Sequence, residues 1–246
     1  MISTVISFST LETRFFPALI KEAKKFSGDI IVVAYDHFFD GSEENIEILS
    51  DLHIKYPELN WFICKWDGDH DSKYWHNNAR WTGAEQAKHR CVLFLDADEI
   101  PDGDLMKQFI KTESLENYVL FMFSCYWYFR DPTNQATTKE GCGLLADMSQ
   151  LSKEMFFTRY ERWIFNPYPT IPTKFYCTLN DQTMFHHYSW VRTKEEMLTK
   201  VKSWAHSGDR NWTQLVENEF EHEFIGKDFV HGYSYNKVPN TFDIGN

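Results

Sequence analysis

Four short apolar runs recur along the first hundred residues at intervals of about thirty residues, which is the length of a βαβ unit. They are Thr4 to Phe8, Ile30 to Ala34, Trp61 to Cys64 and Cys91 to Leu95. Runs such as 30–34 and 91–95 lack the alternation of apolar and polar residues that marks a strand with one face in water. This pattern predicts an α/β fold in which helices cover both faces of a mixed, mainly parallel sheet.

Helical patterns fill the gaps between the runs. The segments 11–26 and 43–56 carry apolar residues at helical spacing, and Gly28 suits the end of the first one. A later helix opens at Thr193, which with Glu196 forms a capping box. Strands that alternate with helices in this way are typical of a doubly wound α/β half.

After Pro101 the regular alternation fades, and the Gly-Cys-Gly sequence at Gly141 to Gly143 predicts a turn. No Gly/Ser-rich or charged linker interrupts the chain. We therefore expect residues 1–246 to form one domain whose C-terminal helices pack back on the sheet.

The charge and cysteine content exclude several classes of protein. A formal net charge of -11 argues against nucleic acid as a partner, because phosphate binding needs clustered Lys and Arg. Five cysteines without CxxC spacing argue against a disulfide framework and favour a cytoplasmic location. The longest apolar run, 118–129, is short of the roughly twenty residues that cross a bilayer, so we expect no transmembrane anchor.

The sequence 94–99, Phe-Leu-Asp-Ala-Asp-Glu, ends an apolar run in acidic residues. In extended backbone Asp96 and Asp98 project to one side, and ligands of open α/β sheets bind beyond the carboxyl ends of the strands. Two such carboxylates can share Mn²⁺ or Mg²⁺, which can bridge to a diphosphate and neutralise a leaving group. The competing interpretation is a solvated acidic turn.

The sequence 77–84, Asn-Asn-Ala-Arg-Trp-Thr-Gly-Ala, followed by Cys91 to Asp98, resembles the ARNxG helix and DxD strand of GT-A glycosyltransferases of the family 2 type. The resemblance covers roughly the first hundred residues. It implies a GT-A, Rossmann-like fold, with a nucleotide-binding half over 1–100 and an acceptor-side half over 101–246. It also implies a nucleotide-sugar donor, UDP-sugar first, and an acceptor that is a glycan, a protein or a small molecule.

The turn Asp40-Gly41-Ser42-Glu43-Glu44 is similar to the family's DDGSxD turn, although the leading aspartate pair is incomplete. The resemblance implies that Asp36 or Asp40 contacts the nucleoside, and that Asn78, Arg80 and Asp96 approach the donor. An ordinary helix-capping turn and surface ion pairs are the competing interpretation.

Late histidines of GT-A enzymes often reach the metal or the diphosphate, and the sequence 185–190, Phe-His-His-Tyr-Ser-Trp, resembles that motif. Adjacent residues of a strand face opposite ways, so we expect one of the two to serve, His187 before His186. Arg192 or Lys194 then becomes a candidate contact for the donor phosphates.

A direct displacement needs a carboxylate base near the acceptor hydroxyl, whereas a retaining mechanism can work without one. Asp147 and Asp181 are our candidate catalytic residues, and Glu140 and Glu161 lie in the same region. Aromatic residues in this half either stack on an acceptor sugar or belong to the core. They include Tyr126, Trp127, Tyr128, Trp163 and Tyr168.

Three other classes share parts of this pattern. A nucleotidyltransferase should carry a glycine-rich loop after the first strand, and the sequence 7–13 has no glycine. A haloacid-dehalogenase-like phosphatase carries its DxD near the N-terminus, without three βα units before it. A non-catalytic carbohydrate-binding protein would not need the acidic and basic residues of a nucleotide site. Metal-dependent glycosyl transfer therefore remains the leading hypothesis.

Overall fold

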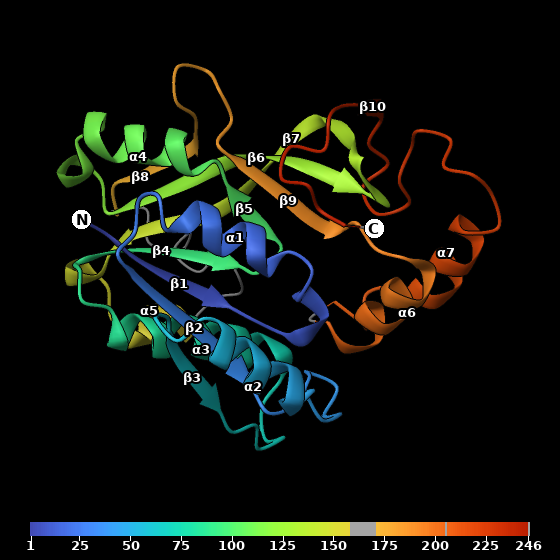
Figure 1. Ribbon diagram of the computed structural model, residues 1–246, viewed down its shortest axis with the longest axis horizontal. Coiled ribbons are helices and arrows are strands. Elements are labelled where there is room, and N and C mark those ends of the chain that lie inside the picture. Colours follow the sequence, from blue (N-terminus) through green and yellow to red (C-terminus); the bar gives the residue numbers. More distant parts are fainter. Residues whose placement is uncertain (158–170, 205, 246) are drawn as a thin grey trace.

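The computed structural model describes residues 1–157, 171–204 and 206–245. Its core is a single mixed sheet (Figure 1). The strands are β1 (Ser3–Ser7), β2 (Asp29–Tyr35), β3 (Asn60–Cys64), β4 (Cys91–Asp96), β5 (Glu99–Pro101), β6 (Leu120–Phe129), β7 (Asp131–Asp147), β8 (Thr173–Cys177), β9 (Phe185–Trp190) and β10 (Tyr235–Lys237). The four strands predicted from the apolar runs are all present.

The order of the strands is β3-β2-β1-β4-β7-β6-β9-β5, with β8 beside β6 and β10 beside β7. Strands β1 to β4 are parallel, so their carboxyl ends meet at one edge of the sheet. β7 is antiparallel to β4 and β6, while β9 is parallel to β6 and antiparallel to β5. The predicted mixed, mainly parallel α/β sheet is confirmed.

Helices cover both faces of the sheet, which explains why the first four strands are apolar without alternation. One face packs against α1 (Phe16–Ala23), α2 (Ile46–Lys55) and α4 (Gly103–Thr112), and the other against α3 (Ser72–Gln86) and α5 (Lys153–Phe157). Successive residues of β2 divide between the two sides: Val32 belongs to the first cluster and Val33 to the second.

A third apolar cluster lies where α6 (Lys194–Ser203) and α7 (Trp212–Glu219) pack together beside β9 (Figure 1). Trp190, Met197, Val201, Trp212 and Val216 are buried there. The capping box of Thr193 and Glu196 is formed, so α6 begins where the sequence predicts. None of the helices in the described part of the chain is long and apolar enough to span a bilayer.

Two expectations differ from the structure. The segment 11–26 is not one helix: a short 3₁₀ turn at Thr10–Glu12 precedes α1, whose first turn holds Pro17. Proline lacks a backbone N–H and suits the first turn of a helix, where the N–H groups have no intrahelical acceptor, so Pro17 marks the start of α1. The predicted turn at Gly141 to Gly143 is instead a bulge inside β7, where Gly143 has a φ of 49° and the pairing with β6 shifts by one residue.

Candidate functional site

A cavity of ≈ 490 Å³ opens at the carboxyl ends of β1, β2 and β4. Residues of these strands form one side of it, α3 contributes His76 and Ala79, and β9, α6 and the start of α7 form the opposite side. Asp96, Asp98 and His187 line this cavity together. The edge of the sheet where ligands of α/β proteins bind is therefore a real cavity here.

The turn after β4 is fixed by backbone contacts. Ala97 N–H donates to the Ser7 carbonyl at 3.1 Å, and Asp96 N–H donates to the buried Glu99 carboxylate at 3.1 Å. The Asp98 carbonyl accepts a hydrogen bond from the Tyr188 N–H at 2.9 Å. Because the strand ends at Asp96, the two aspartates do not continue one extended strand as predicted, and their carboxylates have separate partners.

Asp96 pairs with α3. The Arg80 guanidinium donates to the Asp96 carboxylate at 3.1 Å, and the arginine side chain is buried. Helix α3 brings Arg80 there because Gly83 lets the helix approach β1: a Cβ at Gly83 would lie 2.3 Å from the Val5 side chain. The two sequence motifs of the resemblance thus meet in one ion pair.

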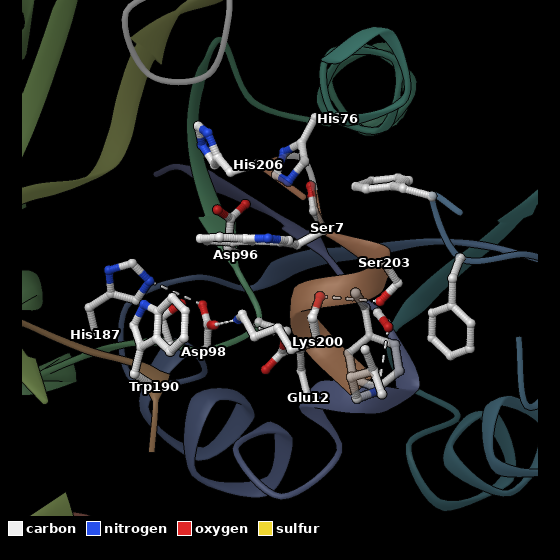
Figure 2. Close-up of a pocket in the computed structure, with 18 of the residues that line it drawn as sticks. Ser7, Glu12, His76, Asp96, Asp98, His187, Trp190, Lys200, Ser203 and His206 are labelled. Atoms are coloured by element: carbon white, nitrogen blue, oxygen red, sulfur yellow. Dashed lines mark hydrogen bonds and ion pairs between the residues drawn. The ribbon is translucent and has the colours of Figure 1, made fainter. Parts of the chain in front are cut away.

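Asp98 lies in a buried cluster of charges (Figure 2). Its carboxylate is 3.0 Å from Lys200 Nζ, 3.3 Å from His187 Nε2 and 3.8 Å from an Arg192 nitrogen. Glu12 accepts hydrogen bonds from both Arg192 and Lys200. Burial alone would raise the pKa of Asp98, but Lys200, His187 and Arg192 hold it well below its usual range.

The chemistry of this donor set does not fit a divalent cation. Both expected carboxylate ligands are already paired with basic side chains: Asp96 with Arg80, and Asp98 with Lys200. In the parts of the chain that the structure describes, no group of three His, Cys, Asp or Glu side chains is arranged to hold a metal ion. The expected Mn²⁺ or Mg²⁺ site is therefore not assembled, because β9 and α6 bring basic side chains to Asp98.

Lys200 and Glu12 were absent from the sequence-based prediction of the site. Lys200 lies three residues after Met197 and next to Val201, both of which are buried on the apolar face of α6. A lysine at helical spacing within an apolar face is the signal that the sequence offered. Neither basic residue proposed as a contact for the phosphates lines the cavity. Arg192 is buried and forms an ion pair with Glu12. Lys194 is the first residue of α6.

Neither of the acidic residues that the sequence predicted at the nucleoside, Asp36 and Asp40, lines the cavity. Asp36 accepts hydrogen bonds from His37, Lys65 and the Trp66 N–H, and so braces the loops after β2 and β3 without lining the cavity. Burial opposes ionisation, but these three partners lower the pKa of Asp36 below its ordinary value. Asp40 is exposed and accepts from Ser42.

Glu44 is the acid of this region that lines the cavity. One of its oxygens accepts the Thr10 N–H, while no described residue donates to Oε2, which is also buried. Burial raises the pKa of Glu44. Asn78 does not line the cavity and donates to the Tyr35 hydroxyl at 2.9 Å, so it supports a tyrosine that does.

His186 and His187 face opposite sides of β9. His187 lies beside Asp98, whereas His186 Nδ1 bonds the Tyr128 hydroxyl at 2.7 Å within the apolar core. Burial lowers the pKa of His186 to about 4. His186 is therefore a core residue.

The carboxylates proposed as catalytic bases lie in different parts of the molecule. Asp147 pairs in register with Cys91 at the amino end of β4, about 17 Å of strand away from Asp96, and binds Arg90. Asp181 lies exposed in the turn before β9. Both are corrections to the prediction, because neither lines the cavity. Glu161 lies outside the described residues.

Glu140 is the fourth candidate base and does line the cavity, where the Tyr233 hydroxyl donates to it. Among the aromatic candidates, Trp127 lines the cavity and packs edge-on against His187 at 4.6 Å between ring centroids. Tyr128 packs in the core beside His186. Trp163 and Tyr168 are not among the described residues.

Comparisons with solved structures give matches at low sequence identity. A Bacillus anthracis protein described as a glucose-1-phosphate thymidylyltransferase shares 10% identity, with 91% of this chain and 97% of that one covered and a TM-score of 0.50. S. aureus TarS in complex with UDP shares 12% identity over 90% and 72% of the chains, with a TM-score of 0.48. GlyE of Streptococcus pneumoniae shares 14% over 89% and 63%, with a TM-score of 0.44. The first of these supports the fold alone.

No curated protein matches the chain. The family model described as glycosyl transferase family 2 matches residues 69–194, just over half of the chain. This range includes the motifs at 77–84, 91–98 and 185–190, but not the turn at Asp40. It contains Arg80, both aspartates of the turn after β4, His187 and Arg192. The chain therefore belongs to glycosyl transferase family 2 and is a glycosyltransferase.

Proposed function

We propose that this glycosyltransferase moves a sugar from a nucleoside diphosphate sugar to a hydroxyl group of a glycan, a protein or a small molecule. The observation that carries the proposal is the cavity at the carboxyl ends of β1, β2 and β4, which joins Asp96, Glu44 and Lys200. UDP-sugar is the donor to test first, on the resemblance to GT-A enzymes. The family assignment leaves the phosphatase and the carbohydrate-binding alternatives without support.

In this proposal the nucleoside occupies the side of the cavity formed by β1, β2 and α3. Glu44 Oε2 is buried there without a donor among the described residues, and a buried acceptor of this kind is stabilised by a ligand N–H or O–H. Asp96, fixed by Arg80, is a second acceptor for the ribose hydroxyls. Glu44 thereby takes the role that the sequence gave to Asp36 or Asp40.

The acceptor occupies the side near Trp127 and Glu140, both of which line the cavity. Glu140 has no ion-pair partner among the described residues, so its carboxylate is available to accept a proton. It takes the proton of the acceptor hydroxyl while that oxygen attacks the anomeric carbon. The bond between the anomeric carbon and the diphosphate oxygen breaks, and the nucleoside diphosphate leaves with the electron pair.

Calorimetric titration of UDP, GDP and CMP into the purified protein tests the donor site. We expect one of the two diphosphates, UDP or GDP, to bind at a single site, and Asp96→Asn to weaken that binding at least about tenfold, because a charge-assisted hydrogen bond is lost. Asp51→Asn, an exposed position on α2, serves as the matched control. Absence of binding by both UDP and GDP would contradict the proposal.

A further inference from the structure

Lys200 is a cation inside the apolar face of a helix. Only 8% of the Lys200 surface is exposed, yet this residue lines the cavity at the edge of the sheet. Burying an ammonium group is costly unless it is paired, and Lys200 Nζ is paired with Asp98 at 3.0 Å and Glu12 at 3.4 Å. The chain thus holds a positive charge where the sequence predicts a metal ion.

The charges of this cluster balance. Two carboxylates, Asp98 and Glu12, face two permanent cations, Arg192 and Lys200. A divalent ion bound to Asp98 would compete with Lys200 for that carboxylate and would leave the buried ammonium group with Glu12, which also binds Arg192, as its remaining acidic partner. The arrangement therefore favours the lysine over an added cation.

Lys200 also keeps a donor for a ligand. An ammonium group has three N–H donors, and within the described residues Asp98 and Glu12 are the acceptors near Nζ. Arg192 has no comparable freedom, because its three nitrogens reach the Ser189 carbonyl, the Leu11 carbonyl and Glu12. Arg192 is buried and does not line the cavity, so it supports Glu12 while Lys200 faces the ligand.

We propose that Lys200 is the resident cation of the donor site: its ammonium group binds the diphosphate and stabilises the charge on the leaving nucleotide, so that no divalent metal is required. A fixed cation aimed at the oxygen where charge develops provides the stabilisation that a metal would otherwise give. Asp98 and Glu12 are then positioning residues that hold the ammonium group in place. This inference rests on the proposed function, because it concerns the same donor.

The experiment is the titration of UDP, GDP and CMP into the full chain, first with EDTA and then with Mn²⁺. For the nucleotide that binds, we expect affinities within about twofold of each other under the two conditions. Binding that appears only with Mn²⁺ would overturn the inference and leave the proposed function standing. Absence of binding under both conditions would overturn both.

Lys200→Met tests the residue itself. We expect it to weaken nucleotide binding in EDTA at least about tenfold. Lys202→Met, on the exposed side of the same helix, should leave the affinity unchanged and is the matched control. The double variant Asp98→Asn/Lys200→Met removes the ammonium group without leaving a carboxylate unpaired, and should show the same loss. If the folded double variant bound the nucleotide as tightly as the natural protein in EDTA, the inference would be wrong.

Discussion

Adjacent residues of β9 serve different purposes because successive side chains of a strand point to opposite faces. His187 lies on the cavity beside Asp98, and His186 lies in the core against Tyr128. The period of a strand was enough to predict that the two would separate. The partner that each one meets depends on β5, β6 and α6, which no local pattern describes.

The burial of His186 predicts a pH dependence of stability. Its pKa is lowered to about 4 in the folded protein, against about 6.5 unfolded, so the unfolded chain binds the extra proton between these values. Stability therefore falls as the pH drops through this window, by about 2 kcal/mol between pH 7 and pH 5 from this residue.

Urea denaturation at pH 7 and pH 5 measures the effect. His186→Asn keeps an acceptor for the Tyr128 hydroxyl and should lose less stability than the natural protein over that interval. His222→Asn, at an exposed position, should keep the full pH dependence. Equal pH dependence in the natural protein and the His186 variant would contradict a buried neutral histidine.

If Glu140 is the base, its substitution should change the rate of glycosyl transfer and not the binding of the donor. Glu140→Gln keeps the size of the side chain and an oxygen that can accept from Tyr233, but it cannot take a proton. The rate of glycosyl transfer or donor hydrolysis should fall by about 10²- to 10⁴-fold, while nucleotide affinity stays the same. Glu47→Gln on the surface of α2 is the control. An unchanged rate would remove Glu140 from the mechanism.

The residues at the site were predictable where they sit at the ends of recognisable elements. Asp96, Asp98 and Arg80 follow from the strand and helix of the resemblance. Lys200 binds Asp98 from 102 residues further along the chain, and Glu12, near the N-terminus, binds the same lysine. Only the folded chain brings these residues together. The basic side chains that surround Asp98 could not be predicted from the motif.

At the scale of the elements, hydropathy gave reliable predictions for buried strands and poor ones for β7. Strand β7 begins with the polar sequence Asp-Pro-Thr-Asn-Gln-Ala-Thr-Thr-Lys-Glu, which has no apolar run. Its pairing with β6, β10 and β4 stabilises it from several sides. The glycines that indicated a turn allow a bulge in the middle of this strand.

The close packing of α3 on β1 predicts a large effect of a small substitution. Gly83→Ala places a methyl group 2.3 Å from the Val5 side chain, so helix and strand must move apart. We expect a loss of about 1–3 kcal/mol in the free energy of unfolding, and a weaker nucleotide affinity because Arg80 moves with α3. Gly208→Ala has no neighbour within 4 Å and should leave both unchanged in urea denaturation and calorimetry. Full stability of Gly83→Ala would contradict the close approach.

At the scale of the whole molecule, the parallel half was predictable and the rest was not. The four parallel strands were predicted from the pattern of βα units, whereas the place of β4 beside β1, and not beside its sequence neighbour β3, is seen only in the structure. The antiparallel and crossover pairings of β5 to β10 join distant segments, and local sequence does not encode them. The cavity lies where the two parts meet.

Release of free nucleotide from a panel of UDP-, GDP- and CMP-sugars tests the central claim most directly. We expect the purified protein to release the nucleotide from one donor class, UDP-sugar first, and Asp96→Asn to lose this activity while Asp51→Asn keeps it. Release from none of the donors, or release that is unaffected by substitution at Asp96, would contradict a glycosyl donor site at the carboxyl edge of this sheet.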